Sequence, residues 1–512
     1  MLASLRPHMA SLVGAASLCA AMGCGRRSRP EDGAAPPSGA GDAWTAPLQS
    51  GLAVDLLTFG GPQHAEPLQR RAVEFRARTG VDVRVHAVEF RELYPTMLDD
   101  LRSQSQKYQA YVFVSQWLTD FAAPGFLDQL DARVAADAEL AWDDIAPFFR
   151  EFDATYDGRI YAIPLDGDFQ VVYYRTDLLA AAGLEPPRTW DDYLALARTF
   201  HGRDFDGDEV PDYGSCISRR PGAQAYSVMW SIAGSYLQSQ GTRQGAFFDV
   251  DTMAPLTDNA AFARALEIYR ATSEYGPPEE RALEHAAMRD LYISGRCALT
   301  VDWGDIGTLA IAPESRVQDL VGAVILPGTR EVLDRETRKL VACTKLTCPY
   351  AVAGVNHAPH AATGGWSGGI ASTASAEVKD AAFAFLSYVS QPAQSSRDVT
   401  IGATGFNPYR WSHFRERAPW IAAGMSEAAS ARYLGAIGLS LTSPNMVLDL
   451  RIQNAQAYQQ EVLDRALGAF LAGERTQAET MQDITTGWNR ITDELGRDAQ
   501  RHAYRASLGL PR

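Results

Sequence analysis

The sequence predicts an α/β protein of two lobes, and three observations carry this prediction. Strand-like and helix-like patterns alternate along the first part of the chain after residue 50, which is typical of a largely parallel sheet covered by helices. The chain has 512 residues, more than a single hydrophobic core usually holds. A passage from Tyr156 to Tyr193 then sets carboxylates between two apolar runs, as expected where a chain passes between lobes.

The first elements read as a βαβ unit followed by a second helix and a third strand. The helix is amphipathic, because Leu68, Ala72 and Phe75 share one face. The expected elements, in order, are strand Ala53 to Phe59, helix Ala65 to Thr79, strand Val81 to Val88, helix Glu89 to Gln106 and strand Ala110 to Val114. Ligands of such sheets bind beyond the carboxyl ends of the strands, where Gln63 and Trp117 stand.

The passage from Tyr156 to Tyr193 begins with an Asp157-Gly158 turn. A strand from Arg159 to Leu165 and a second one from Phe169 to Tyr174 flank the Asp166-Gly167-Asp168 interruption. A helix from Leu178 to Ala182 closing at Gly183, and a second from Trp190 to Phe200 with Thr189 as its N-cap, complete the passage. Polar residues at the strand ends are therefore expected to face a ligand.

Further helices are expected at Ala260 to Tyr275, Ala376 to Val389 and Asn454 to Ala472. The stretch from Thr329 to Ala362 lacks convincing periodicity and is long for a plain connection. We interpret this stretch as an insertion loop.

The N-terminus has the layout of an export signal. An apolar run from Met9 to Gly23 follows Arg6 and His8, and it is too short to span a bilayer comfortably. Ala21-Met22-Gly23-Cys24 looks like a lipobox, which predicts cleavage after residue 23 and acylation of Cys24. Residues 24–50 are rich in Gly, Ala, Pro and Ser, which predicts a disordered tether. We expect an exported lipoprotein, periplasmic or on the cell surface, attached to a membrane only by its lipid.

Net charge indicates which partners the protein can bind, and the number of cysteines indicates whether it forms disulfides. A net charge of −15 and an isoelectric point near 5.1 argue against a nucleic-acid partner. After Cys24 four cysteines remain, an even number in a chain that is expected to be exported. Cys343 and Cys348 are the favoured disulfide pair, and Cys216 with Cys297 follows if both lie in the second lobe.

An acidic loop places oxygen ligands at calcium-loop spacing. Asp204, Asp206, Asp208 and Asp212 occupy the first, third, fifth and ninth positions, with the Val210 carbonyl at the seventh. The twelfth position lacks the bidentate glutamate and the sixth lacks glycine, so the alternative is a solvated acidic loop. If an ion binds, we expect structural calcium; no cofactor is required.

Several motifs together resemble the extracellular solute-binding proteins of ABC transporters, in the family that includes maltose-binding protein. The resemblance covers about residues 53–391. Besides the passage described above, it depends on Trp117 with Gly125-Phe126-Leu127, on Ser294 to Leu299 running to Trp303, and on Gly364-Gly365-Trp366 running to Ile370.

The resemblance implies a type II periplasmic-binding-protein fold with a hinge and a cleft between lobes. The implied division is residues 51–166 and 363–409 for the first lobe, and 167–362 and 410–505 for the second, with 329–362 as the insertion. The first 23 residues are then the signal peptide.

A sugar is bound by aromatic rings on its C–H faces and by carboxylates and amides at its hydroxyl rim. The candidate rings are Trp117, Trp230, Trp303, Trp366 and Phe406, and the candidate rim partners are Gln63, Asp168 and Asp305. For each tryptophan the alternative is ordinary packing. For Asp166 and Asp168 it is capping of backbone donors at a turn.

The function implied is non-enzymatic capture of a carbohydrate, mono- or oligosaccharide, for delivery to a membrane permease. The protein is expected to act as a monomer. One alternative is a glycoside hydrolase using Asp166 and Asp168, although two residues on one strand leave both carboxyl groups on one side of a substrate. Another is a ligand-sensing protein for a non-sugar solute.

Overall fold

The computed structural model describes residues 48–222 and 225–511. The predicted signal peptide, Cys24 and nearly all of the predicted tether lie outside the described residues. Within the described ranges, no helix combines the length and apolar character needed to cross a bilayer.

The first sheet has five strands in the order β2-β1-β3-β14-β6. Strand β1 pairs in parallel with both β2 and β3, whereas β14 runs antiparallel to β3 and to β6. The bounds are β1 Ala53–Phe59, β2 Asp82–Val88, β3 Ala110–Val114, β6 Ala162–Pro164 and β14 Trp366–Ile370. The predicted parallel pairing is present among β2, β1 and β3, the first three strands of the described chain. Strand β14, which comes about 250 residues later in the chain, forms the antiparallel pairs.

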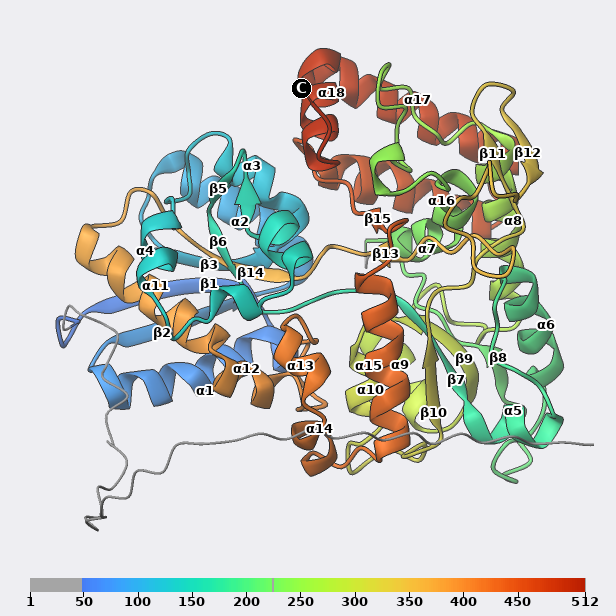
Figure 1. Ribbon diagram of the computed structural model, residues 1–512, viewed down its shortest axis with the longest axis horizontal. Helices are drawn as coiled ribbons and strands as arrows, with labels where there is room; N and C mark the ends of the chain where they lie inside the picture. Colours follow the sequence, from blue (N-terminus) through green and yellow to red (C-terminus); the bar gives the residue numbers. More distant parts are fainter. Residues whose placement is uncertain (1–47, 223–224, 512) are drawn as a thin grey trace, which may run out of the picture. The chain divides into compact units, whose positions relative to one another are not determined.

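Helices α1 (Gly61–Thr79) and α2 (Phe90–Ser103) cover opposite faces of this sheet (Figure 1). The predicted face of α1 is buried at Leu68, Ala72 and Phe75. Helix α11 (Ala376–Ser390) packs beside α1, and Ser375 caps it by accepting the N–H of Val378. The shorter elements near this sheet are η1 Ser115–Trp117, α3 Leu118–Ala122, α4 Asp131–Ala136, η2 Trp142–Asp144, η3 Phe149–Asp153, α12 Pro392–Asp398 and α13 Trp411–Arg415.

The strand predicted from Arg159 to Leu165 is divided in the structure. Residues Arg159–Ile160 (β5) pair with β4 (Thr155–Tyr156), whereas β6 pairs with β14. The N–H of Tyr161 and that of Ala162 both point to the carbonyl of Ala154, which turns the chain out of one pairing and into the other. Periodicity misses this break because both pieces are apolar.

The second sheet has four strands in the order β10-β7-β9-β8, with only β8 and β9 parallel. Its strands are β7 Val171–Arg175, β8 Tyr213–Ser215, β9 Cys297–Asp302 and β10 Val321–Val324. Side chains of β7 alternate: Val172 and Tyr174 join one apolar cluster, and Val171 and Tyr173 join the other. Each cluster therefore covers one face of the second sheet, and the cluster with Val171 and Tyr173 also contains the apolar residues of the first sheet.

Helix α6 (Trp190–Phe200) begins as predicted, because Thr189 and Asp192 form a reciprocal capping box. The predicted C-terminal helix is a π-helical stretch, Ala457–Asp464, followed by α16 (Arg465–Leu471). The other helices are α5 Thr176–Ala182, α7 Ala225–Leu237, η4 Thr242–Gln244, α8 Ala260–Ser273, α9 His285–Ile293, α10 Asp305–Leu309, α14 Ala418–Ala422, α15 Glu427–Leu441, α17 Gln477–Leu495 and α18 Arg497–Ser507.

The stretch interpreted as an insertion loop, residues 329–362, contains regular structure that its sequence did not reveal. They contain a hairpin of β11 (Glu331–Asp334) and β12 (Lys339–Ala342), and β13 (His360–Ala361) pairs with β15 (Val447–Leu448). The hairpin strands are only four residues long, so they are too short to give a clear two-residue period.

Both predicted disulfides are present, Cys343–Cys348 and Cys216–Cys297. The first closes a short surface loop after β12. The second joins the end of β8 to β9, two strands that also pair with each other.

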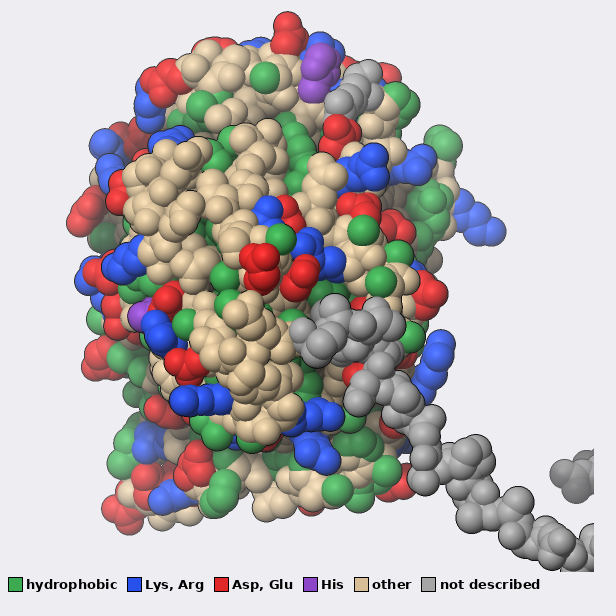
Figure 2. Space-filling model, turned by 90° about the vertical axis from the view of Figure 1, so that its left-hand side faces the viewer, with side chains coloured by type: hydrophobic (Ala, Val, Ile, Leu, Met, Phe, Trp, Pro, Cys, Tyr) green, Lys and Arg blue, Asp and Glu red, His purple; other side chains and the backbone are tan. Residues whose placement is uncertain are grey.

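Charges of both signs are mixed on the face shown in Figure 2, with Lys and Arg side chains interspersed among Asp and Glu.

Candidate functional site

Three passes of the chain between the two sheets meet at one buried polar cluster. The first pass carries Asp166 and Asp168, the second carries Thr363 and the third carries Asn407. The backbone N–H of Asn407 donates to Asp166 Oδ1 at 2.6 Å, and its side-chain amide donates to Asp168 Oδ1 at 3.2 Å. The hydroxyl of Thr363 donates to Asp168 Oδ2 at 3.1 Å. Asp168 therefore connects all three passes.

The second sheet adds three charged residues to this cluster. Arg289 comes from α9, Asp302 ends β9 and Asp305 begins α10. The Arg289 guanidinium donates to Asp302 Oδ1 at 2.7 Å and to Asp305 Oδ2 at 2.9 Å. Asp305 Oδ2 also lies 3.5 Å from the side-chain nitrogen of Asn407. Predicted residues Asp168 and Asp305 are thus brought together.

The cluster holds more carboxyl groups than cations, and burial penalises their charge. Burial, followed by the nearby Asp305, raises the pKa of Asp168 to about 8. Burial, followed by Asp168, also raises the pKa of Asp166 well above its usual range. At neutral pH Asp168 therefore holds a proton and can donate as well as accept, unlike the ionised acceptor expected from the sequence.

Two predicted aromatic residues meet around a histidine that sequence reasoning missed. The His64 ring lies 4.0 Å from the Trp366 ring and 5.5 Å from the Phe406 ring, centroid to centroid. Trp366 is also stacked on Phe59 at 5.9 Å. Burial, followed by the Arg289 charge, lowers the pKa of His64 to about 3, so this ring is neutral. The aromatic group and the acid cluster adjoin, because Phe406 of the first is followed directly by Asn407 of the second.

Gln63 lies beside this aromatic group at the start of α1. Its carbonyl accepts the N–H of Gly405 at 2.9 Å, next to Phe406. Helix α1 is fixed to α12, which precedes the third chain pass, by a buried ion pair in which Arg71 Nε donates to Asp398 Oδ2 at 2.8 Å. The hydroxyl of Thr404 donates to the carbonyl of the same Asp398. This arrangement holds Gln63 and Phe406 on one side of the junction.

Trp303 faces the same junction from the second sheet. Its indole N–H donates to the carbonyl of Ala362 at 3.3 Å, next to Thr363. Its ring lies edge-on to His285 at 4.9 Å. The indole is 4% exposed, so it is enclosed between the second chain pass and α9.

The structure does not bring the other two predicted tryptophans to the cluster. Trp230 packs against Phe247, 4.2 Å away between ring centroids, and lies near Trp488 in the core of the second lobe. Trp117 is fully buried behind Phe90, whose ring lies 5.7 Å away and separates Trp117 from Trp366. Both tryptophans are therefore buried core side chains.

Asp166 and Asp168 do not have the arrangement that hydrolysis needs. Both carboxyl groups are buried and bond to Asn407, whose backbone N–H donates to Asp166 and whose side-chain amide donates to Asp168. Glycosidases place their two carboxyl groups on either side of the bond that breaks. The geometry offers no support for the hydrolase alternative.

The predicted calcium loop brings three of its carboxylates together. Ligand-capable oxygens of Asp204, Asp206 and Asp208 lie within 4.8 Å of one another, and all three side chains are exposed. Asp212 turns away, because it pairs with Arg296 and accepts the N–H of Phe205 at 2.7 Å. The Val210 N–H donates to Asp208 at 2.8 Å. Calcium binding stays a prediction for this loop.

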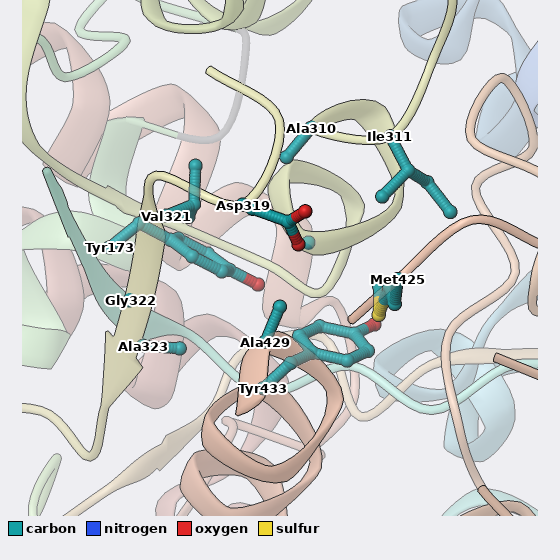
Figure 3. A pocket seen from close by; sticks show the side chains of 11 residues that line it. Tyr173, Ala310, Ile311, Asp319, Val321, Gly322, Ala323, Met425, Ala429 and Tyr433 are labelled. Atoms are coloured by element: carbon teal, nitrogen blue, oxygen red, sulfur yellow. The ribbon is translucent and has the colours of Figure 1, made fainter. Parts of the chain in front are cut away.

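A separate pocket lies between β7, β10, α10 and the start of α15 (Figure 3). Tyr173, Asp319 and Tyr433 supply its polar atoms, and the rest of the lining is mainly apolar. Burial, followed by the charges of Asp305, Asp166 and Asp168, raises the pKa of Tyr433. Tyr433 lines this pocket and also packs beside Gly307 of α10, the helix that Asp305 begins.

Comparison with known proteins identifies the family. A model of the bacterial extracellular solute-binding proteins matches residues 61–395, more than half of the chain. The chain belongs to this family. As a family member it is a solute-binding protein, the class that its motifs resemble.

Two curated relatives give a narrower comparison. A mannitol-binding protein of Pseudomonas aeruginosa is 28% identical over 219 residues, which are 42% of this chain and 46% of the relative. A probable amino-acid ABC transporter periplasmic-binding protein of Sinorhizobium fredii is 22% identical over 261 residues, 50% of this chain and 57% of the relative. The chain spans about half the length of these relatives.

Solved structures of solute-binding proteins share the two-lobe fold. An ABC transporter solute-binding protein of Agrobacterium radiobacter in complex with ribitol matches with a TM-score of 0.69 at 20% identity, covering 87% of this chain and 100% of that one. A maltose-bound MalE3 of T. maritima matches with a TM-score of 0.67 at 19% identity, covering 86% and 100%. A protein of Agrobacterium vitis with bound D-mannitol matches with a TM-score of 0.66 at 20% identity, covering 87% and 99%. These matches confirm the predicted fold class.

Sequence reasoning already points to Asn407, which directly follows the candidate Phe406 in the chain. It misses two other residues of the site. Arg289 and His64 lie in helices whose apolar pattern gives no reason to single them out. Arg289 and His64 become site candidates only in the folded structure, where distant segments of the chain come together.

Proposed function

We propose that this protein captures a carbohydrate between its two lobes and delivers it to the permease of an ABC importer. The observation that carries the proposal is the junction where aromatic rings adjoin buried carboxyl, amide and guanidinium groups. Trp366, Phe406 and Trp303 bring aromatic rings to this junction, and rings of this kind bind the C–H faces of sugars. Asp168 and Arg289 offer hydrogen-bonding groups to hydroxyls.

The junction also has the connectivity that lobe closure requires. Asp168, Thr363 and Asn407 bond across three chain passes, and hinges in such proteins are a few residues of this kind. Ligand contacts from both lobes favour the closed form, since a ligand shifts the equilibrium by its differential affinity for the two states.

Acyclic sugar alcohols and monosaccharides are the first ligands to test. The ribitol and D-mannitol complexes among the structural matches, and the mannitol-binding relative, support this choice. Longer glucosides are the second class, since a maltose-bound protein shares the fold. Amino acids form the third class, because one relative is named as an amino-acid binding protein.

Titration calorimetry of the full chain carrying Cys24→Ser against mannitol, ribitol, tagatose, maltose and an amino-acid mixture tests the proposal. Saturable 1:1 heat with at least one carbohydrate is the expected result. If only the amino acids give binding heat, the ligand is an amino acid and not a carbohydrate, and the protein is still a solute-binding protein.

We further propose that the chain is exported and held at a membrane by lipid on Cys24, as its N-terminal sequence indicates. The permease is then the membrane partner and the bound protein acts as a monomer. Labelling with radioactive palmitate, lost in Cys24→Ser, tests the anchor. Light scattering of the purified protein tests the monomer.

A further inference from the structure

Three exposed apolar side chains of the second lobe lie in one loop system. Leu346 is 85% exposed, Val352 is 66% exposed and Tyr350 is 46% exposed, although each is a large apolar residue. They lie within seven residues of one another, after the hairpin of β11 and β12. We define residues 343–355 as the disulfide loop. Clustered exposed apolar residues mark interaction sites, whereas single ones need no explanation.

The disulfide loop is an ordered structure that presents Leu346 to the outside. The Cys343–Cys348 bond closes its first part. Inside this ring the Thr344 hydroxyl accepts the N–H of Leu346 at 3.3 Å and that of Thr347 at 3.2 Å. The Cys348 N–H donates to the Thr344 carbonyl at 2.7 Å.

The carbonyls at the tip are bound as well. The side-chain amide of Gln240 donates to the carbonyl of Leu346 at 3.0 Å and to that of Thr347 at 2.8 Å. The Tyr350 ring packs beside the adjoining Gly241, so both apolar side chains are held by one turn. A loop that enters a weakly polar medium must satisfy its backbone groups internally, and the tip does so at Leu346 and Thr347.

The second part of the loop ends in a tight turn. Val352 and Val355 exchange both backbone hydrogen bonds, and Ala353 and Gly354 between them have φ of 50° and 74°. Two positive φ angles in sequence are those of a primed hairpin turn, which holds its geometry rigidly. Val352 is therefore fixed at the surface next to the Tyr350 segment.

The surface at the disulfide loop carries two cations, although the chain as a whole is acidic. Arg330 and Lys345 are exposed, and neither has an ion-pair partner among the residues the structure describes. Arg330 lies beside Gly354, and its carbonyl accepts the N–H of Cys343. The acid nearest in sequence is Glu331, and residues 337–360 contain no Asp or Glu. The net charge of the whole chain is −15, so an unopposed basic spot with exposed apolar side chains is a local feature.

We propose that the disulfide loop is a contact surface for anionic phospholipid, in which Leu346, Tyr350 and Val352 enter the headgroup layer and Arg330 and Lys345 pair with phosphates. Apolar side chains flanked by unpaired cations on a hydrogen-bonded scaffold match an anionic lipid surface in both charge and polarity. The contact orients the second lobe at the membrane, independently of any lipid attached to the N-terminus.

Co-sedimentation with lipid vesicles tests this proposal. All proteins are the full chain carrying Cys24→Ser, so that no attached lipid contributes. Vesicles are phosphatidylglycerol with phosphatidylcholine in equal parts, or phosphatidylcholine alone. We expect binding to the first that weakens as salt rises, and little binding to the second.

Variants locate the contact. Removing a cation at an anionic surface weakens binding about five-fold per charge, so Arg330→Gln/Lys345→Gln should weaken it about 25-fold. Leu346→Ser should weaken it about ten-fold. The matched controls are Arg159→Gln/Arg417→Gln and Leu439→Ser, which remove exposed cations and an exposed leucine elsewhere and should change binding less than about two-fold.

Carbohydrate titration and thermal unfolding of each variant check that the fold is intact. Absence of binding to the anionic vesicles would overturn the proposal. So would equal losses in the loop variants and their controls. A loop variant that keeps vesicle binding but loses a protein partner in a cross-linking experiment would assign the loop to that protein instead, and would equally overturn it.

Discussion

Replacing Asp168 by Asn should remove part of the pH dependence of stability. In the unfolded chain an aspartate loses its proton near pH 3.8, whereas the folded protein holds the Asp168 proton until about pH 8. The native state therefore binds one more proton than the unfolded state between these values. Stability from this group is fully present below pH 3.8 and is lost as pH rises toward 8.

The size of the effect follows from the same window. One extra bound proton changes the free energy of unfolding by about 1.4 kcal/mol per pH unit. Between pH 5 and pH 7 the contribution of Asp168 thus falls by about 2.7 kcal/mol. The Asp168→Asn variant has no proton to lose at this position. The shift of Asp166, which owes part of its raised pKa to Asp168, shrinks in the same direction.

Urea unfolding of both proteins at pH 5, 6 and 7 gives the measurement. The stability of the wild type relative to Asp168→Asn should decline by about 2 to 3 kcal/mol across this range. Asp99→Asn, at an exposed position, is the control and should leave the slope unchanged. A wild-type-minus-variant difference that stays constant within about 0.5 kcal/mol would refute the protonation of Asp168 in the folded protein.

Three further predictions concern the junction and the acidic loop. Trp366→Ala should weaken carbohydrate binding at least about 30-fold in calorimetry, since a central aromatic contact contributes about 2 kcal/mol or more, while Trp142→Ala should leave it unchanged; equal affinities would exclude Trp366 from the site. Gly365→Ala should cost about 2 to 4 kcal/mol in urea unfolding, because an added Cβ would overlap the carbonyl of Asp166 at a φ of 134°, whereas Gly473→Ala, in open space, should cost about 1 kcal/mol; similar costs would contradict the close approach. If the loop of Asp204, Asp206 and Asp208 binds calcium, the ion should raise the melting temperature and Asp206→Asn should abolish the rise; an unchanged melting temperature in calcium and in chelator would reject it.

The sequence predicts regular elements well where one physical signal dominates. Strands β1 and β3 begin and end where the apolar runs do, and α6 begins at its capping threonine. Prediction fails where pairing partners decide the structure. The break at Tyr161 depends on which strand each half meets, and the β11–β12 hairpin is too short for a period.

Candidate site residues follow the same division. Asp168 and Trp366 stand next to the ends of strands, and this position in the sequence is sufficient to predict them as site residues. Trp230 has the same chemistry but lies on α7, a helix buried all round, and packs into the core. His64 and Arg289 become candidates only because helices distant in sequence meet at the junction. The residue types within one segment do not show which other segments of the chain meet it in the folded protein.

The decisive experiment for a carbohydrate site is titration calorimetry of the full chain carrying Cys24→Ser with mannitol, ribitol and maltose, repeated with Trp366→Ala. We expect saturable binding of one molecule of at least one of these carbohydrates, with the variant at least about 30-fold weaker. Silence with every carbohydrate, or binding that does not depend on Trp366, would contradict a carbohydrate site at the junction of the two lobes.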